Sequence, residues 1–240
     1  MAVNRQQIEA KRLSPFHHKQ ASLEARFTVN EFGWAIAEQF TDPVKEKEAA
    51  ERTVGIADLS HLAKLSLNGI ALTHAISELY GSGVDFKAQL LTNGRGLVKD
   101  AWCAVFSSDE AMLVLNESVK EKVVRDMSVI PPTHFTVTDV SSVLAGCYMI
   151  GRNSRRLLQK LTELNVNAEE FPNLSVTRTP VRHLPTITLR NDIGILLAYQ
   201  LYFERAYAEF VWNVIFSGGK ELGVAPVGSS AMRLLGLSLR

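Results

Sequence analysis

The chain has 240 residues, of which 46% are apolar, and its 26 basic residues against 25 acidic ones leave a net charge of +1. This length and composition are typical of one large globular domain and exclude a disordered or fibrous chain. The balanced charge argues against a nucleic-acid-binding protein, because phosphate binding needs an excess of clustered cations. No apolar stretch reaches the ~18 residues of a membrane span, so we expect a cytoplasmic protein that works without a membrane.

The predicted elements of the N-terminal half begin after a polar arm, residues 1–12, which is expected to be flexible. Asp42 is a good N-cap and Pro43 suits the first helical position, which predicts a helix over 42–52. Apolar periodicity and turn residues predict the other elements of this half. They are a strand over 62–67, a helix over 69–80, strands over 97–106 and 112–115 that form a hairpin, and a helix over 118–127.

Pro131 and Pro132 mark the one candidate break inside an otherwise single domain over 13–240. The elements predicted after it are strands over 135–139, 143–150, 186–189 and 194–203, a helix over 153–164 capped by Asn153, and a helix over 204–216 ended by Gly218 and Gly219. Strands and helices interleave with hairpins along the whole chain. The predicted fold class is therefore α+β, with ferredoxin-like antiparallel sheets and packed helices.

Short motifs assign no chemistry to the chain by themselves. The six histidines show no metal-ligand spacing, and the glycine-rich pieces lack the patterns of phosphate-binding loops. Asp58, Ser60 and His61 have the residue types of a hydrolytic triad, but neighbours on one strand point to alternating faces and cannot form a relay. Cys103 and Cys147 each lie in an apolar stretch, which predicts buried and reduced thiols.

A series of short segments, in a fixed order along the chain, carries a family resemblance. The segments include Glu31-Phe-Gly-Trp34, Gly55-Ile-Ala-Asp-Leu-Ser-His-Leu62, Gly96-Leu-Val-Lys-Asp100, Gly151-Arg-Asn-Ser-Arg155 and Gly218-Gly-Lys-Glu-Leu-Gly223. In them the chain resembles the glycine cleavage system T-protein, an aminomethyltransferase of a folate-binding superfamily, over about residues 13 to 237. The resemblance implies that tetrahydrofolate binds in a central channel and exchanges a one-carbon unit with a small methylated substrate.

The resemblance places the catalytic acid of the family at the start of the predicted hairpin. The family carries two successive acids there, and the first lies beside the reacting nitrogens of the folate. In this chain Lys99 stands in the first position and Asp100 in the second. Because a lysine opposes developing positive charge instead of stabilising it, Asp100 is the candidate catalytic residue.

The folate-binding residues that the resemblance implies are also only partly retained. Gln200 stands where the family has a glutamate that pairs with the pterin, and an amide offers one acceptor and one donor group in place of two acceptors. Ile193 replaces a tyrosine, and Met232 replaces an arginine, with Arg233 one position later. The candidate folate-binding residues are Trp102, Asn116, Tyr199, Gln200 and Arg233.

T-proteins continue beyond the stretch that this chain matches, into a barrel that helps to close the folate channel. A small stand-alone member of the superfamily, the gamma subunit of sarcosine oxidase, resembles the folate-binding portion alone. We therefore expect a T-protein-like subunit of a tetrahydrofolate-linked one-carbon transfer or demethylation complex, in which another chain supplies the barrel or the catalytic residues. The alternatives are an autonomous tetrahydrofolate-dependent methyltransferase or aminomethyltransferase that uses Asp100, Asn116 and Gln200, and a non-catalytic interaction module with a vestigial folate pocket.

Overall fold

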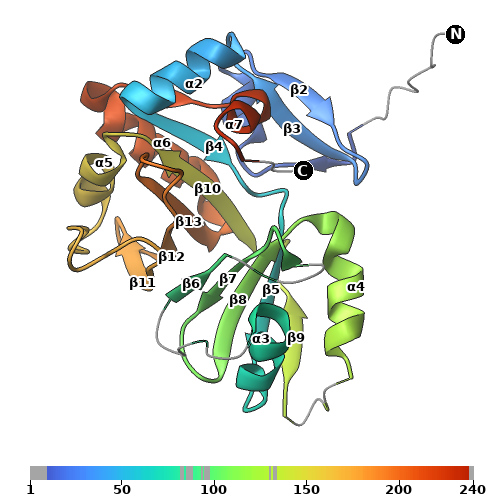
Figure 1. The fold of residues 1–240 in the computed structure, drawn as a ribbon. Helices are drawn as coiled ribbons and strands as arrows, with labels where there is room; N and C mark the ends of the chain where they lie inside the picture. The colour runs from blue at the N-terminus through green and yellow to red at the C-terminus, as the bar shows by residue number, and fades with distance from the viewer. Residues whose placement is uncertain are drawn as a thin grey trace, which may run out of the picture.

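A computed structural model describes residues 10–81, 84, 89–92, 94, 98–129, 131 and 134–237 of the chain. Three sheets organise these residues (Figure 1). A three-stranded sheet is built from residues 12–39, and a six-stranded sheet combines residues 54–58 with strands from residue 144 onward, whereas a five-stranded sheet and two helices are built from residues 63–139. This mixture of largely antiparallel sheets and packed helices confirms the predicted α+β class.

The three-stranded sheet lies where the two ends of the chain meet. Its strands, in spatial order, are β1 (Arg12–Leu13), β3 (Trp34–Gln39) and β2 (Arg26–Val29), with the short helix α1 (His17–Ala21) between β1 and β2 in sequence. Two further helices are α2 (Pro43–Arg52) and α7 (Ser229–Leu234). Helix α7, from the C-terminal end, packs against both α2 and β3 (Figure 1).

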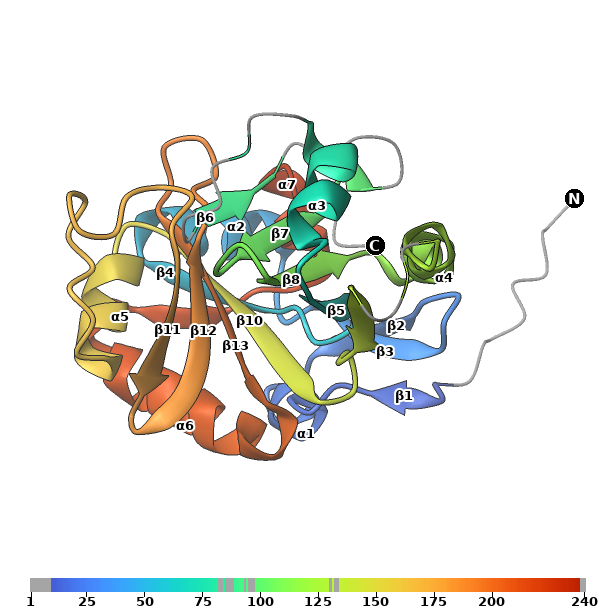
Figure 2. The same ribbon diagram turned by 90° about the horizontal axis from the view of Figure 1, so that it is seen from below.

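The six-stranded sheet is covered by helices on one face. Its spatial order is β11 (Val176–Val181), β12 (Leu184–Arg190), β13 (Ala198–Glu204), β10 (Leu144–Ile150), β4 (Val54–Asp58) and β14 (Val224–Pro226), antiparallel except for the pair β4 and β14. The covering helices are α5 (Ser154–Leu161) and α6 (Ala208–Gly219), and short 3₁₀ helices over Arg205–Tyr207 and Lys220–Leu222 flank α6 (Figure 2). Leu157, Trp212 and Ile215 belong to the apolar cluster that joins these helices to the sheet.

The five-stranded sheet packs against the other face of the six-stranded sheet. Its order is β6 (Gln89–Leu91), β7 (Trp102–Val105), β8 (Glu110–Leu115), β5 (Ala63–Asn68) and β9 (Thr136–Asp139), with helices α3 (Leu72–Tyr80) and α4 (Glu117–Met127). Met112 and Val114 of β8 share an apolar cluster with Tyr148 and Tyr202 of the six-stranded sheet. This intersheet layer is the buried interface between the two parts of the molecule.

Most of the predicted elements are present with small shifts at their ends. Seven elements match predicted ranges: α2 (predicted over 42–52), β5 (62–67), α3 (69–80), α4 (118–127), β9 (135–139), β10 (143–150) and β12 (186–189). The predicted hairpin is formed by β7 and β8, but residues 98–100 form a turn before it, and Leu97 lies outside the described residues. The strand predicted over 194–203 begins only at Ala198, because the preceding residues form a tight turn closed by a bridge between Ile193 and Leu196.

The predicted N-cap of one helix and the predicted end of another differ from the structure. Asn153 precedes α5, but its side chain donates to the carbonyl oxygen of Leu222 at 2.9 Å instead of capping the helix. Helix α6 runs through Gly218 and Gly219, and the helical path ends at Gly223, whose φ of 73° suits glycine. Residues 1–9 of the predicted arm and Pro132 of the predicted break lie outside the described residues.

The start of α2 follows the predicted capping chemistry, which gives a first test. The Asp42 carboxylate accepts hydrogen bonds from the backbone N–H groups of Val44 and Lys45 at 3.0 and 3.1 Å. Asp42→Ala is expected to lower the free energy of unfolding by about 1 kcal/mol, because it leaves helix-terminal donors without their acceptor. Urea denaturation measures this loss. Asp42→Asn, which keeps an acceptor oxygen, should lose less, and equal losses in the two variants would contradict the capping role.

Candidate functional site

Buried polar side chains lie on the face of the six-stranded sheet that turns toward the five-stranded sheet. Gln200 and Tyr202 share this face of β13, because residues two positions apart point to the same side of a strand. Tyr148 of β10 is the cross-strand partner of Gln200, and the three side chains are 0% exposed. From the facing sheet, Trp102 packs against Tyr148 with ring centroids 6.1 Å apart. We call Tyr148, Gln200, Tyr202 and Trp102 the intersheet cluster.

The hydrogen bonds of the intersheet cluster leave one donor group, the Gln200 amide nitrogen, poorly paired. The Tyr202 hydroxyl donates to Gln200 Oε1, and the Tyr148 hydroxyl donates to the carbonyl oxygen of Asn191, each at 2.7 Å. Burial raises the pKa of both hydroxyls, for Tyr148 against the opposing effect of the nearby Gln200 amide, so both remain protonated at neutral pH. Gln200 Nε2 is buried and has no partner at good hydrogen-bond geometry, beyond a weaker contact with the Tyr148 hydroxyl. Since a poorly paired buried amide costs up to about 1–3 kcal/mol, this nitrogen is a candidate ligand contact.

A hollow of about 520 Å³ opens beside Tyr202. Its walls are mostly apolar and include Leu144, Pro180, Pro185, Ile187, Tyr202 and Phe203, together with the charged side chains of Arg178 and Glu204. The Tyr202 ring therefore borders the hollow and, through its hydroxyl, holds the Gln200 amide. A hollow of this size with few polar groups is typical of sites that bind small molecules.

An ion pair joins the two sheets next to the hollow. Both guanidinium nitrogens of Arg178, on β11, donate to the carboxylate of Glu110, on β8, one of them at 2.8 Å. The same guanidinium lies 4.0 Å from the centre of the Phe106 ring. Hydrogen bonding from Arg178 lowers the pKa of Glu110, so this pair stays ionised at neutral pH.

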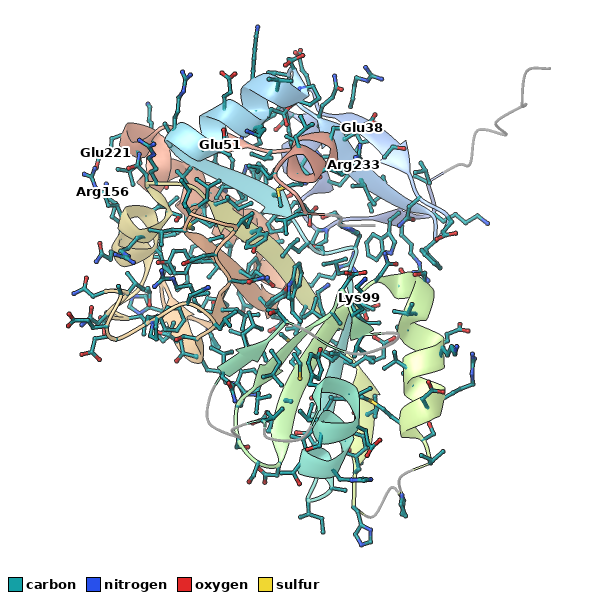
Figure 3. The ribbon with its side chains drawn as sticks, viewed as in Figure 1. Glu38, Glu51, Lys99, Arg156, Glu221 and Arg233 are labelled. Carbon is teal, nitrogen blue, oxygen red and sulfur yellow. The ribbon has the colours of Figure 1, made fainter. Side chains whose placement is uncertain are left out.

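Three of the predicted site residues lie at one end of the five-stranded sheet. Trp102 pairs with Val114, two residues before Asn116, and Asp100 lies in the exposed turn that leads into β7. Asn116 accepts a hydrogen bond from the backbone N–H of Ser118 at 3.0 Å and caps α4. Lys99 shares the exposed turn with Asp100, at the end of the sheet that faces the rest of the molecule (Figure 3).

The other predicted residues do not all converge on the intersheet cluster. Tyr199 lies on the opposite face of β13 from Gln200 and stacks on Phe171, with ring centroids 6.4 Å apart. Arg233 is exposed on α7 and donates to Ser230 Oγ at 2.7 Å (Figure 3). Its neighbour Met232 is buried and belongs to the intersheet layer. The structure thus groups Gln200 with Trp102, places Asp100 and Asn116 at the edge of the layer, and separates Tyr199 from it.

Comparison with known proteins identifies the fold that carries this site. A family model described as the GCVT N-terminal domain matches residues 16–238. The chain belongs to this family. The aminomethyltransferases of Halothermothrix orenii and Koribacter versatilis are 25% and 26% identical to it over 93% and 92% of its length. These matches cover 64% and 60% of the relatives, so the chain spans about three fifths of the length of the curated relatives it matches.

Solved structures agree with the family at the level of the fold. The glycine cleavage system aminomethyltransferase T of Bartonella henselae matches with a TM-score of 0.78 at 15% identity, over 95% of this chain and 63% of its own. A chain of the heterotetrameric sarcosine oxidase of Corynebacterium sp. U-96 matches with a TM-score of 0.63 at 17% identity, over 90% of this chain and 99% of its own. The resemblance to T-proteins that the sequence segments predicted is confirmed, and the chain has the T-protein fold.

In this GCVT-family chain, Tyr148 and Tyr202 belong to the candidate site, although the sequence analysis did not select them. The spacing of Gln200 and Tyr202 was a usable signal, because an i, i+2 pair on a strand shares a face. Gly146 adds a second one: a Cβ there would lie 2.6 Å from the Tyr202 ring, so only glycine leaves room for the ring. Within the described ranges, no group of acidic, histidine or cysteine side chains is suited to a metal ion, and no helix is long and apolar enough to span a membrane.

Proposed function

We propose that this chain is a T-protein-like subunit of a tetrahydrofolate-linked one-carbon transfer or demethylation complex, and that the folate binds between the hollow and Gln200. The observation that carries the proposal is the buried Nε2 of Gln200, which has only a weak contact with the Tyr148 hydroxyl and lies on the same sheet face as the hollow. Membership of the GCVT family supports it, because the matched relatives are aminomethyltransferases. Tetrahydrofolate, when bound, supplies the one-carbon unit or accepts it.

The hydrogen-bonding groups of Gln200 suit one edge of a pterin ring. Oε1 accepts from the Tyr202 hydroxyl in the closed site, and once that ring moves aside its lone pairs are available beside the N–H groups of Nε2. An amide that offers an acceptor next to a donor complements a lactam, which offers an N–H next to a carbonyl oxygen. The residue types present therefore fit the pterin lactam edge, although Gln200 stands where the family has a glutamate.

The apolar walls of the hollow would hold the aromatic body of the ligand. Tyr202 borders both the hollow and the Gln200 amide, so the ligand reaches the amide only when the Tyr202 ring moves aside. Trp102 closes the layer from the facing sheet through its contact with Tyr148. Among the predicted binding residues, Gln200 and Trp102 are thus the ones that the proposal places next to the pterin.

The charged turn before β7 supports the participation of another chain. Lys99 and Asp100 are both exposed there, so neither charged side chain is buried in the intersheet layer. We propose that a partner chain orders this turn or supplies the catalytic acid. The structural relative from Corynebacterium is described as heterotetrameric, which agrees with this assignment.

Titration calorimetry of the full chain with tetrahydrofolate tests the proposal. We expect a dissociation constant in the micromolar range, on the order of the −8 kcal/mol that 1 μM represents. Para-aminobenzoylglutamate, which lacks the pterin, should bind at least tenfold more weakly. If neither compound binds at millimolar concentration, the folate site is absent and the chain is an interaction module. If the chain alone turns over a methylated donor with tetrahydrofolate, it is an autonomous enzyme and needs no partner.

A further inference from the structure

Two short crossings carry the chain between the six-stranded and the five-stranded sheet. Residues 59–62 join β4 to β5, and residues 140–143 join β9 to β10 (Figure 1). Because all residues from β5 to β9 lie between these crossings in sequence, they are the two covalent connections between the five-stranded sheet and the rest of the chain. Any movement of one sheet relative to the other must bend both crossings.

Lys64, at the start of β5, contacts both crossings. Its Nζ donates to the carbonyl oxygens of Ser60 and Leu62 at 2.9 and 2.8 Å. Its backbone carbonyl accepts from the N–H of Val140 at 2.9 Å, and its own N–H donates to Ser141 Oγ at 3.0 Å. Lys64 is 0% exposed, so its amino group is held in the junction away from bulk solvent.

The first crossing is in turn fixed to the six-stranded sheet. The N–H of Leu59 donates to the carbonyl oxygen of Gly146 at 2.8 Å, and the N–H of Gly146 donates to Ser60 Oγ at 3.2 Å. Lys64 Nζ therefore connects β5, the crossing and β10 through a short series of hydrogen bonds. The amino group can reach water only if these hydrogen bonds break.

We propose that Lys64 is a proton-linked clamp: opening of the junction between the two sheets exposes the Lys64 amino group, which then takes up a proton. The physical reason is that a buried ammonium lacks the hydration that it has in water, whereas a neutral amine keeps donors for both carbonyl oxygens in the closed form. Opening and protonation thus favour each other. This property concerns the fold alone and does not depend on folate binding.

The charges around Lys64 agree with this coupling. Burial lowers the pKa of Lys64 to about 7, although Asp58, Asp139 and Glu117 oppose the shift, and Arg205 adds to it. These groups come from β4, β9, α4 and the 3₁₀ helix before α6, which surround the junction. Once exposed, the lysine regains a pKa of about 10.4. The equilibrium constant for opening is then expected to fall about tenfold per pH unit between about pH 7 and 10, and to be independent of pH below about pH 7.

Hydrogen exchange of the full chain, followed by NMR and corrected for intrinsic rates, tests the clamp. The amides of Lys64 and Val140 should open more often than the amide of Leu201 in the middle of β13, and their opening should fall about tenfold per pH unit above about pH 7.5. Lys64→Met should remove this pH dependence, whereas Lys122→Met, which changes an exposed lysine on α4, should keep it.

Three outcomes would overturn the clamp. The first is pH-independent opening in the unmodified chain, and the second is an unchanged pH dependence in Lys64→Met. The third is equal opening of the crossings and of Leu201, which would mean that only global unfolding exposes Lys64. If Lys64→Met does not fold, the Cε resonance of Lys64 in the unmodified chain decides: a titration midpoint near 7 is expected, and a midpoint near 10 contradicts the proposal.

Discussion

Gln200→Leu is expected to weaken tetrahydrofolate binding about 10- to 100-fold, the equivalent of about 1–3 kcal/mol for a buried hydrogen-bonding group that loses its partner. Leucine has a similar volume but cannot pair with the pterin, and it also leaves the Tyr202 hydroxyl without the acceptor that it has at 2.7 Å. Titration calorimetry with tetrahydrofolate gives the affinity directly. Thermal unfolding of the same sample shows whether the variant is folded at the temperature of the titration.

Two further variants separate ligand recognition from folding. Gln159→Leu makes the same change at an exposed position of α5 and should leave the affinity unchanged. Gln200→Glu keeps an acceptor for the Tyr202 hydroxyl but has no N–H donors, so it should bind a different pterin edge and depend on pH in a way that the unmodified chain does not. If Gln200→Leu is folded and binds tetrahydrofolate with unchanged affinity, Gln200 is not part of the site.

Glu46→Ala is expected to lower the free energy of unfolding by about 3–5 kcal/mol, because three backbone N–H groups lose a charged acceptor and each such hydrogen bond is worth about 1.5–3 kcal/mol before water replaces part of it. Glu46 is 4% exposed and accepts three backbone hydrogen bonds. Oε1 accepts from Phe40 and Thr41 at 2.6 and 2.7 Å, and Oε2 accepts from Gly228 at 2.8 Å. Alanine would leave three backbone donors unpaired where the two ends of the chain meet. Urea denaturation monitored by circular dichroism measures the loss.

The control for this variant lies two residues away on the same helix. Glu48 is exposed, so Glu48→Ala should change the free energy of unfolding by less than about 0.5 kcal/mol. Glu46→Gln, which keeps one acceptor oxygen, should fall between the two. Because Gly228 is the N-cap of α7, Glu46→Ala should also loosen the helix that carries Met232 and Arg233. Equal stabilities of Glu46→Ala and Glu48→Ala would contradict the role of Glu46.

Local chemistry explains which elements could be predicted from the sequence. The start of α2 depends on Asp42 and Pro43, which act within one helical turn, and the prediction is correct. Strand β14 and helix α7 were not predicted, because β14 pairs with β4 from the other end of the chain and α7 is held by Glu46. Such distant pairings leave no periodic pattern in the short segments themselves.

The candidate site could be predicted only in part, because it too depends on pairings between distant segments of the chain. Family resemblance selected Gln200, but the pairing of its strand with Tyr148 depends on the register between β10 and β13. Strand alternation alone separates Tyr199 from Gln200, and the structure places Tyr199 on the opposite face. The burial of Lys64 was not predictable, because it follows from two crossings that are far apart in sequence and meet only in the folded chain.

A crystal structure of the chain with tetrahydrofolate tests the proposed folate site most directly. We predict that the pterin lies on the face of β13 that carries Gln200 and Tyr202, with its lactam edge within hydrogen-bonding distance of Gln200 Nε2 and Oε1. The Tyr202 ring should have moved from its position over Gly146. A folate bound elsewhere, such as on the Tyr199 face of the sheet, or an unchanged intersheet cluster at saturating ligand, would contradict the proposed folate site.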